Sequence, residues 1–397
     1  MSKKRIGLVL PNTPAYSETF FKSKIEGLVD NGYEVLLFVG NSTNPKIPNT
    51  RIYKQLKIHK NIFIQLIKLI WVLLIATIFY PKILKKYIQL EKSEGISFQK
   101  LMKNIYINHH ILKLKKLEWL HFGFATMAIR RELVAKTLGA KMAVSLRGFD
   151  VCIYPLKHQG IYDRLWLFVD KVHTISDDLL KVAYGLGLST EIPFQKITPA
   201  VDIKFFQETA NIINFSKGEP IQFLTIARLH WKKGIVYVLK ALSILKKEGV
   251  SFDYYILGEG PEREQLLYDI QDLDLLDCVH LVGKASRQVV KEFLIKSNIY
   301  IQYSIQEGFC NAVLEAQAMG KLCIVSDAEG LSENVENEKS GWIVSKREPI
   351  KLLEKIKMVI RLPKSDLHQI SMYAVQRVKK SFNIKKQQEE FLEFYES

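Results

Sequence analysis

Two glutamates, Glu307 and Glu315, stand in the segment IQEGFCNAVLEAQAMG at residues 305–320. The residues before it, NIYIQYS, are rich in β-branched and aromatic side chains and predict a strand. Glu307 and the glycine after it break that strand, and Asn311 is a favourable N-cap for the helix-forming run AVLEAQAM. The free backbone N–H groups at such a helix start suit a polar, partly anionic ligand. A surface loop with a capping glutamate is the alternative interpretation of this segment alone.

Cations and glycines follow two other expected strands. IARLHWKKG places Arg228 and Lys233 after one strand, and LGEGPE places Gly258 and Gly260 after the next. Two cations at neighbouring carboxyl ends of one sheet would suit a diphosphate. A single basic residue on a loop is more often merely solvated, and a glycine pair alone can be only a tight turn. It is the combination with the glutamate segment that favours a binding site.

Apolar strands that alternate with helices predict parallel sheets covered on both faces. The expected strands cover residues 5–11, 33–40, 117–124, 141–148 and 171–177 in the first half, and 221–229, 252–260, 278–283, 298–304, 322–327 and 340–345 in the second. The expected fold class is therefore α/β, with two Rossmann-like doubly wound domains that face a cleft. We place the domains at 1–200 and 201–375, followed by a helical segment at 376–397 that can pack back on the first domain.

Several functional classes lack their signature in this chain. The first strand is followed by LPNTPAYSET, without G-x-G-x-x-G, and there is no G-x-x-x-x-G-K-[ST]. The four cysteines form no C-x-x-C, which fits a reducing cytoplasm. The apolar run near the N-terminus is too short for a signal peptide. We expect a cytoplasmic protein without a nicotinamide or flavin cofactor.

Residues 51–118 form a basic insert with fourteen lysines and arginines and three glutamates, within a chain of net charge +16. One basic region suggests one face that meets an anionic partner, either nucleic acid or an anionic membrane surface. The uncharged run 69–80 has only twelve residues, whereas about 20 are needed to span a bilayer, so we predict no transmembrane helix.

Two interpretations of this run remain, a buried core helix and an amphipathic element in the membrane interface. The aromatic residues within the run and the lysines that follow it favour the interface. They are Trp71, Phe79, Tyr80, Lys82, Lys85 and Lys86.

The motifs, taken together, resemble a known family. R-L-x-x-x-K-G at 228–234, GEGP at 258–261 and EGFCNAVLE at 307–315 resemble the second domain of the retaining, nucleotide-sugar-dependent glycosyltransferases of family 4, which have the GT-B fold. The first half is similar through SETF at 17–20, SLRGFD at 145–150, TISD at 174–177 and PAVDIKFF at 199–206. SETF, SLRGFD and SDAEGLSE resemble the bacterial exopolysaccharide branch of colanic-acid type. The resemblance covers nearly the whole chain and is weakest over the basic insert.

The resemblance implies a role for each site residue. Arg228, Lys233 and Glu307 would be catalytic: the cations neutralise the donor diphosphate, and Glu307 contacts the transferred sugar. Glu315 would bind the ribose hydroxyls. The remaining donor-binding residues would be Asn311, Ala312, Gly258, Gly260 and Glu333, and the acceptor side of the cleft would hold Ser17, Glu18, Thr19, His121, Arg147 and Asp150. No cofactor or metal is expected, and the D-x-D at 272–274 lies at the wrong end of the sheet for one.

The chain departs from the family pattern at three places. Arg147 stands where the family often has histidine, which keeps a cation but loses a neutral donor. Glu329 and Gly330 replace a pair of glycines, so the backbone approach to the sugar is in question. Cys310 replaces a common proline, and we interpret it as a small buried residue rather than a nucleophile.

The leading hypothesis is a glycosyltransferase that adds a sugar, with retention, to a growing surface polysaccharide on a lipid-linked acceptor at the inner face of the cell membrane. The expected partners are thus a nucleotide-sugar, this acceptor and an anionic membrane surface. A transferase for a soluble acceptor, a catalytically dead sugar-binding homologue and a basic nucleic-acid-binding protein are the alternatives. The last is disfavoured because no nucleic-acid-binding module is recognisable, so no nucleic acid is expected as a partner.

Overall fold

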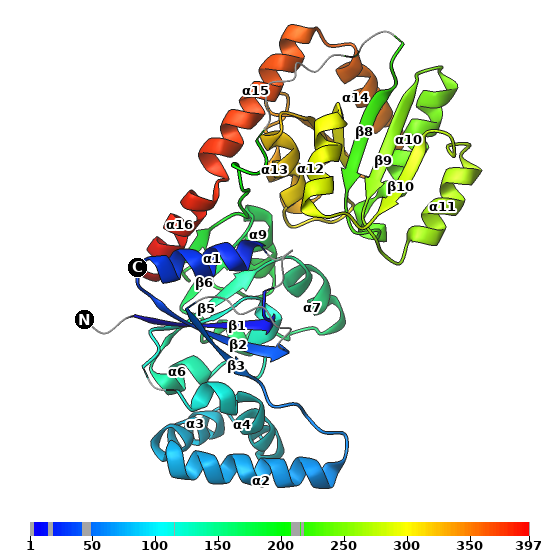
Figure 1. Cartoon of the computed structure of the whole chain (residues 1–397). Helices are drawn as coiled ribbons and strands as arrows, with labels where there is room; N and C mark the ends of the chain where they lie inside the picture. The colour runs from blue at the N-terminus through cyan, green and yellow to red at the C-terminus, as the bar shows by residue number, and fades with distance from the viewer. Residues whose placement is uncertain are drawn as a thin grey trace. The chain divides into compact units, whose positions relative to one another are not determined.

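The computed structural model describes residues 4–14, 19–41, 49–114, 116–207, 215 and 218–396. It divides into two compact units, the first made of residues 1–197 and 387–397 and the second of residues 198–386 (Figure 1). Residues 376–386, which the sequence assigned to a separate terminal segment, belong to the second unit, and residues 387–397 belong to the first.

The first unit is built on a seven-stranded parallel sheet of order β3-β2-β1-β4-β5-β6-β7. The strands are β1 (Arg5–Asn12), β2 (Glu34–Asn41), β3 (Thr50–Lys54), β4 (Trp119–Phe122), β5 (Lys141–Leu146), β6 (Lys171–Thr174) and β7 (Phe194–Lys196). The helices around it are α1 (Thr19–Asp30), α5 (Ala125–Ala128), α6 (Val134–Leu138), α7 (Tyr154–Lys157), α8 (Asp163–Trp166) and α9 (Asp177–Gly185), with a π-helical turn at Phe149–Ile153. The central strands are buried on both faces, as their near-continuous apolar sequences predict.

The chain returns to the first unit at its end. Helix α16 (Ile384–Glu396) buries Phe391, Phe394 and Tyr395 in the core that α1, β1 and β2 also form. The indole Nε1 of Trp119 donates to the carbonyl of Tyr395 at 3.1 Å, and Lys171 Nζ donates to the carbonyl of Phe394 at 2.9 Å. Figure 1 shows this helix in red beside α1.

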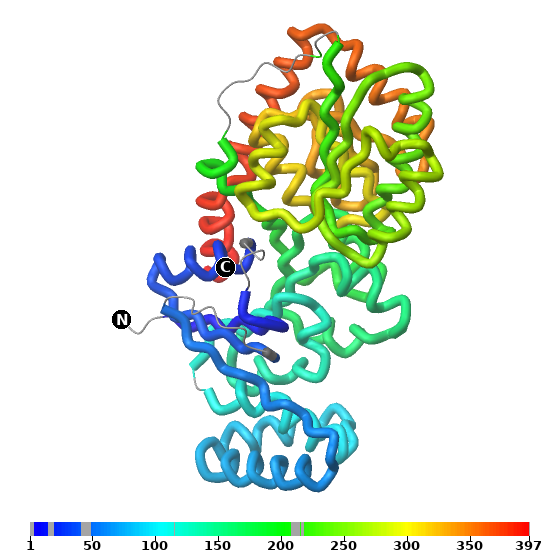
Figure 2. Tube along the Cα trace, turned by 45° about the vertical axis from the view of Figure 1, so that its right-hand side comes forward, coloured from blue at the N-terminus to red at the C-terminus, as the bar shows by residue number. Residues whose placement is uncertain are grey.

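The basic insert folds into three helices that pack on one another: α2 (Ile62–Phe79), α3 (Pro81–Ser93) and α4 (Phe98–Leu112). They lie beyond β3, the edge strand of the first sheet, as the tube of Figure 2 also shows in blue and cyan. The side chain of Asn61 caps α2 by accepting from the backbone N–H groups of Phe63 and Ile64 at 2.9 and 3.3 Å. Pro81 stands at the start of α3, where its missing N–H costs nothing.

Helix α2 corrects one expectation and excludes one of the two alternative interpretations. It continues through Gln65 and Lys68, so its 18 residues are long and apolar enough to cross a membrane by length and composition, and the argument from a twelve-residue run is wrong. It is not a core helix either, because Val72 and Ala76 are its buried residues and most of its large apolar side chains are exposed.

The second unit has a six-stranded parallel sheet of order β10-β9-β8-β11-β12-β13. Its strands are β8 (Ile221–Ile226), β9 (Phe252–Leu257), β10 (Val279–Gly283), β11 (Ile299–Gln302), β12 (Leu322–Ser326) and β13 (Trp342–Val344). Its helices are α10 (Ile235–Lys247), α11 (Arg263–Asp272), α12 (Arg287–Lys296), α13 (Asn311–Ala318), α14 (Pro349–Ile360) and α15 (Lys364–Ser381). Short 3₁₀ turns follow β8 at Trp231–Lys233 and β12 at Glu329–Asn334.

The strand order reverses between β8 and β11. From β8 the chain proceeds outward through β9 and β10, and it then returns to the other side of β8 to form β11. At such a switch point the carboxyl ends of the strands open a crevice that binds ligands in α/β sheets. The prediction of two doubly wound α/β domains is confirmed, and the predicted cations and glutamates follow β8 and β11.

Candidate active site

The turns after β8 and β11 touch through a glycine. Gly234 has φ 63°, and a Cβ on it would lie 2.1 Å from the carbonyl oxygen of Tyr303. The backbone N–H of Ile305 donates to the carbonyl of Lys232 at 2.7 Å across the same contact. Because both the backbone angle and the space require glycine, this position fixes how Lys233 approaches the segment after β11.

The predicted glycines Gly258 and Gly260 support the same loop from the other side. A Cβ at Gly258 would lie 1.9 Å from the carbonyl oxygen of Ala227, and one at Gly260 would lie 2.1 Å from that of Leu229. The N–H of Leu229 donates to the carbonyl of Glu259 at 3.0 Å. The two glycines therefore let the β9 turn press on the backbone around Arg228, whose side chain is exposed.

Lys233 and Glu307 form an ion pair at the centre of the site, with 14% and 15% of their side chains exposed. Burial lowers the pKa of Lys233, but the charge and hydrogen bond of Glu307 more than offset this, and the net pKa lies above its ordinary value. The positive charge of Arg228 acts to lower the pKa of Lys233. The three predicted catalytic residues, two cations and one carboxylate, therefore lie close enough for their charges to influence one another.

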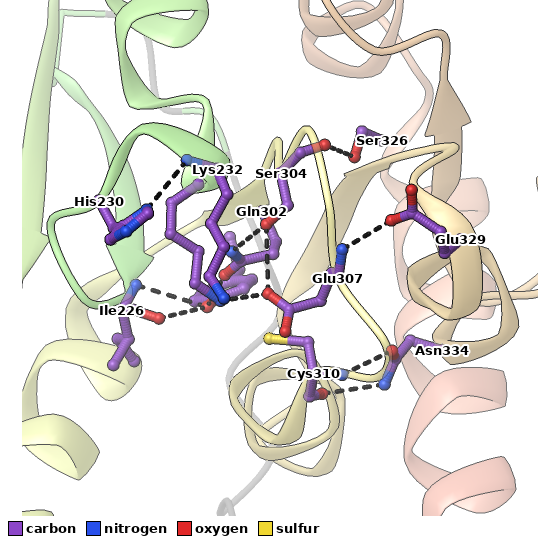
Figure 3. Close-up of polar contacts among 12 residues, drawn as sticks. Ile226, His230, Lys232, Gln302, Ser304, Glu307, Cys310, Ser326, Glu329 and Asn334 are labelled. Atoms are coloured by element: carbon purple, nitrogen blue, oxygen red, sulfur yellow. Dashed lines mark hydrogen bonds and ion pairs between the residues drawn. The ribbon is translucent and has the colours of Figure 1, made fainter. Parts of the chain in front are cut away.

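A buried polar chain leads to Glu307 along β11. Tyr300 OH donates to Gln302 Oε1 at 2.9 Å, Gln302 Nε2 donates to Ser304 Oγ at 2.9 Å, and Ser304 Oγ donates to Glu307 Oε2 at 3.3 Å (Figure 3). The hydroxyl of Ser326, on β12, donates to the carbonyl of Ser304 at 2.5 Å. The sequence analysis missed these residues, although a glutamine and a serine within a buried apolar strand are a signal that such a chain exists.

Glu329, the departure from the paired glycines, holds Glu307 from the opposite side (Figure 3). Its Oε2 accepts from the backbone N–H of Glu307 at 2.8 Å, and Lys346 Nζ lies 3.4 Å from its Oε1. Glu329 adopts φ 21°, an unusual backbone angle for a residue with a side chain. Its carboxylate therefore fixes the backbone of Glu307, the glutamate predicted to be catalytic.

The start of α13 differs from the prediction in its cap. Cys310 occupies the N-cap position and Asn311 is the first helical residue, so the expectation that Asn311 caps the helix is wrong. The reason is Asn334, whose Oδ1 accepts from the N–H of Cys310 at 3.0 Å and whose Nδ2 donates to the carbonyl of Cys310 at 2.9 Å. Burial, reinforced by Glu307, raises the pKa of the Cys310 thiol to about 12, which is consistent with a small buried residue.

Arg377 ties the turn after β12 to α15. Its Nη2 donates to the carbonyl of Glu333 at 3.0 Å and its Nη1 to that of Asn334 at 2.8 Å. Glu333, predicted to complete the donor pocket, is half-buried in this turn. Two sets of contacts therefore anchor the loop that carries Glu329 and Glu333. Asn334 joins it to Cys310, and Arg377 joins it to α15.

Glu315 is half-buried on α13. No hydrogen bond to its carboxyl group is found among the residues that the structure describes, whereas its backbone carbonyl accepts from the N–H of Met319 at 3.1 Å. Burial raises its pKa to about 7, although the charge of Arg287 acts in the lowering direction. Arg287 is itself held by Asp202 at 3.2 Å and lies over the ring of Phe205, 4.3 Å from its centroid. A pair of hydroxyl groups would satisfy such a carboxyl group.

The structure places the predicted acceptor-side residues differently. Ser17 and Glu18 lie outside the described residues, and of Thr19 the structure describes the backbone, at the start of α1. His121 is fully buried beneath α16, with its Nδ1 2.6 Å from Tyr395 OH and its Nε2 2.8 Å from Ser145 Oγ. It therefore packs inside the first unit instead of lining a cleft.

Arg147 and Asp150 shape the loop after β5. The guanidinium of Arg147 lies 4.0 Å from the centroid of the Phe20 ring, which is a cation–π distance. Asp150 is completely buried, and its carboxylate accepts from the N–H groups of Arg147 and Ala125, each at 3.0 Å. Asp150 thus shapes the backbone, while Arg147 keeps a half-buried charge beside α1.

No group of three potential metal-ligating side chains occurs among the described residues. The D-x-D at 272–274 ends α11 ahead of β10, and Asp274 pairs with Lys246 at 3.4 Å while it stays exposed. Both aspartates are therefore exposed at the surface, away from the carboxyl ends of the strands, and Asp274 is held by Lys246.

Comparison with known proteins identifies the family of this chain. The family model "Glycosyl transferases group 1" matches residues 206–377, which span both turns of the site. The amylovoran biosynthesis glycosyltransferase AmsK of Erwinia amylovora is 26% identical over 393 residues, with 93% of this chain and 94% of AmsK covered. The chain belongs to the group 1 glycosyl transferases.

Within these transferases, the exopolysaccharide branch expected from the sequence is confirmed. The "Putative colanic acid biosynthesis glycosyltransferase WcaL" of Salmonella typhimurium is 30% identical over 276 residues, or 66% of each chain. An Escherichia coli relative, named UDP-Gal:alpha-D-GlcNAc-diphosphoundecaprenol alpha-1,3-galactosyltransferase, is 24% identical and covers 63% of this chain and 68% of its own. The crystal structure of Anabaena HepE with UDP has the same fold, with a TM-score of 0.72, 14% identity and 99% of both chains covered.

The raised pKa of Glu315 predicts a pH-dependent stability for this transferase. An unfolded glutamate has a pKa of about 4.3, so between there and about 7 the folded protein binds the proton more tightly than the unfolded chain. The free energy of unfolding should therefore fall as pH rises through this window, and Glu315→Gln should make the fall smaller. Urea unfolding at several pH values measures this, with exposed Glu354→Gln on α14 as control. Parallel curves for wild type and Glu315→Gln would contradict the raised pKa of Glu315.

Proposed function

We propose that this glycosyltransferase transfers a sugar from a nucleotide-sugar, with retention, to a growing surface polysaccharide on a lipid-linked acceptor. The observation that carries the proposal is the Lys233–Glu307 pair, with Arg228 beside it, at the switch point of the second sheet. A nucleotide-sugar presents a diphosphate to the cations and sugar hydroxyls to the carboxylate. Retention rests on the resemblance to family 4.

In this proposal the cations supply the electrostatic part of catalysis. Cleavage of the bond between sugar and diphosphate concentrates negative charge on the leaving oxygen, and fixed cations stabilise that charge most in the transition state. Lys233 is held by Glu307 and is therefore positioned before the reaction begins. The side chain of Arg228 is exposed to solvent and is therefore accessible to the diphosphate of a bound donor. No metal is needed for the same purpose.

The two glutamates would then serve different parts of the donor. Glu315, which lacks a described hydrogen-bond donor, would accept from the ribose hydroxyls, and these do not change during the reaction. Glu307 is fixed by Ser304, by Glu329 through its backbone and by Lys233. It would face the sugar, whose charge does change.

This division predicts distinct kinetic defects. Glu315→Gln should raise KM for the donor about tenfold with little loss of kcat, because uniform binding is lost, whereas Glu307→Gln should lower kcat about 100-fold. Steady-state transfer of labelled sugar from a panel of nucleotide-sugars to lipid-linked oligosaccharide measures both values. Lys247→Ala, an exposed change at the end of α10, is the control. A shift in KM alone for both glutamate variants would refute the division, and no transfer from any donor would refute the proposed reaction.

The lipid-linked acceptor is supported by helix α2 and by the named substrate of the Escherichia coli relative. One side of α2 presents a continuous apolar stripe, whose members are 50–74% exposed: Phe63, Ile67, Ile70, Leu74 and Ile78. These residues recur at helical spacing and lie within the basic insert. Apolar side chains flanked by lysines are typical of a surface that enters the headgroup region of an anionic membrane. We therefore propose peripheral attachment to the cytoplasmic face of the membrane.

Membrane attachment predicts that the protein sediments with vesicles that contain phosphatidylglycerol. The double change Ile67→Ser and Leu74→Ser should weaken this binding at least tenfold, because each buried CH₂ contributes about 0.8 kcal/mol. High salt should release part of the wild-type protein, since it screens the lysines but not the apolar contact. Ile350→Ser, at an apolar residue of α14 that is also exposed, is the matched control. If wild type stays in the supernatant, or the double variant sediments equally, the attachment is wrong.

A further inference from the structure

An apolar groove of about 340 Å³ runs between α2 and α4, beside the exposed stripe of α2. Leu66 and Leu69 line it from α2, and Met102 lines it from α4. The aromatic ring of Tyr106 and the side chain of Ile107, both buried, also form part of the lining. The groove is thus a concave apolar surface that borders the surface proposed to meet the membrane.

The groove keeps its shape through contacts at its margin. Tyr106 OH donates to the carbonyl of Lys57 at 3.0 Å, which ties the segment before α2 to α4. Phe98, 72% exposed, and Ile62, 76% exposed, also line the groove. Large apolar residues left in water at the margin of an apolar groove indicate that an apolar ligand covers them.

Two cations, Lys103 and Arg130, belong to the lining, and none of the described lining residues is acidic. Neither cation forms an ion pair with a residue that the structure describes. The backbone of Arg130 is fixed at φ 65°, with its carbonyl bound by Asn108 Nδ2 at 2.8 Å and its N–H bound to Glu132 Oε1 at 3.0 Å. The groove therefore combines an apolar channel with positive charge on a rigid backbone.

We infer that this groove binds the isoprenoid chain of a polyprenyl diphosphate, with Lys103 and Arg130 near its diphosphate. The inference rests on the proposed lipid-linked acceptor and goes further, because it names the residues that hold the lipid. An apolar chain matches the leucines and Met102, and a diphosphate matches two cations that have no acidic partner among the described residues. Because the groove borders the apolar stripe of α2, the isoprenoid chain can pass from the bilayer into the groove without crossing water.

Farnesyl diphosphate, a short water-soluble polyprenyl diphosphate, is the probe for this groove. We expect saturable binding of the labelled compound to the full-length protein in equilibrium dialysis. Leu66→Trp and Met102→Trp, which fill the groove, should each weaken binding at least tenfold. Leu276→Trp is the matched control, because it makes the same leucine-to-tryptophan change at a residue that is 63% exposed and belongs neither to the groove nor to the apolar stripe of α2. It should leave the affinity within twofold of wild type.

The same assay tests the role of the positive charge at Arg130 and the identity of the ligand in the groove. Arg130→Gln should weaken binding of farnesyl diphosphate but not of farnesol, and lysophosphatidylglycerol should compete poorly. A photoreactive farnesyl diphosphate should label peptides from residues 58–69 or 98–107. Absence of binding in wild type, equal affinities for Leu66→Trp and Leu276→Trp, labelling elsewhere, or equal competition by the lysolipid would each overturn the inference.

The groove assignment and the proposed function can fail independently of each other. If farnesyl diphosphate occupies the groove but the enzyme glycosylates only a water-soluble saccharide, the proposed acceptor is wrong and the groove assignment stands. If the enzyme uses a polyprenyl-linked acceptor but groove-filling variants bind and react as the Leu276→Trp control does, the groove assignment alone is wrong.

Discussion

The site in the second unit depends on the close approach of two turns at Gly234. No side chain fits between this residue and the carbonyl of Tyr303, so the turns after β8 and β11 can meet only with glycine here. The neighbouring Lys233 is thereby brought to Glu307. The attraction between their opposite charges offsets part of the free-energy cost of removing both from water. Ser304 and Glu329 then fix the side chain and the backbone of Glu307 from opposite sides. A charged group so constrained is suited to stabilise a transition state without reorganisation.

The first unit solves a different physical problem, because its helical insert leaves apolar surface in water. Side chains such as Ile67 and Leu74 on α2 would ordinarily be buried in a soluble protein, and their exposure has a cost in solubility. The proposed attachment to a membrane would remove that cost, and the groove beside that surface would then select one lipid from it. In this account the insert brings the enzyme to its acceptor, whereas the second sheet carries the donor chemistry.

The sequence was sufficient for features that depend on local pattern. Parallel strands followed from continuous apolar runs, and the positions of Arg228 and Glu307 followed from the ends of those strands. The cap of α13 was misassigned because Asn334, which is remote in sequence, decides it by binding Cys310. The burial of His121 was missed because the covering helix α16 comes from the far end of the chain.

The insert shows a limit of another kind. An apolar helix has the same composition whether it packs in a core or meets a membrane, so the exposure of α2 follows only from the packing of α3 and α4. Glu329 presents a similar case, since its role depends on a contact with the backbone of Glu307 that no local motif encodes. Long-range contacts, rather than weak propensities, account for what sequence reasoning left open.

The central claim is that protein cations, without a metal, hold the diphosphate of the donor. Calorimetric titration of UDP and of GDP into the protein in the presence of EDTA tests it most directly. We expect saturable binding of at least one nucleotide without divalent metal, and binding at least tenfold weaker in Arg228→Ala than in wild type, with Lys247→Ala as control. Binding that requires added magnesium or manganese, or that is unchanged in Arg228→Ala, would contradict the account.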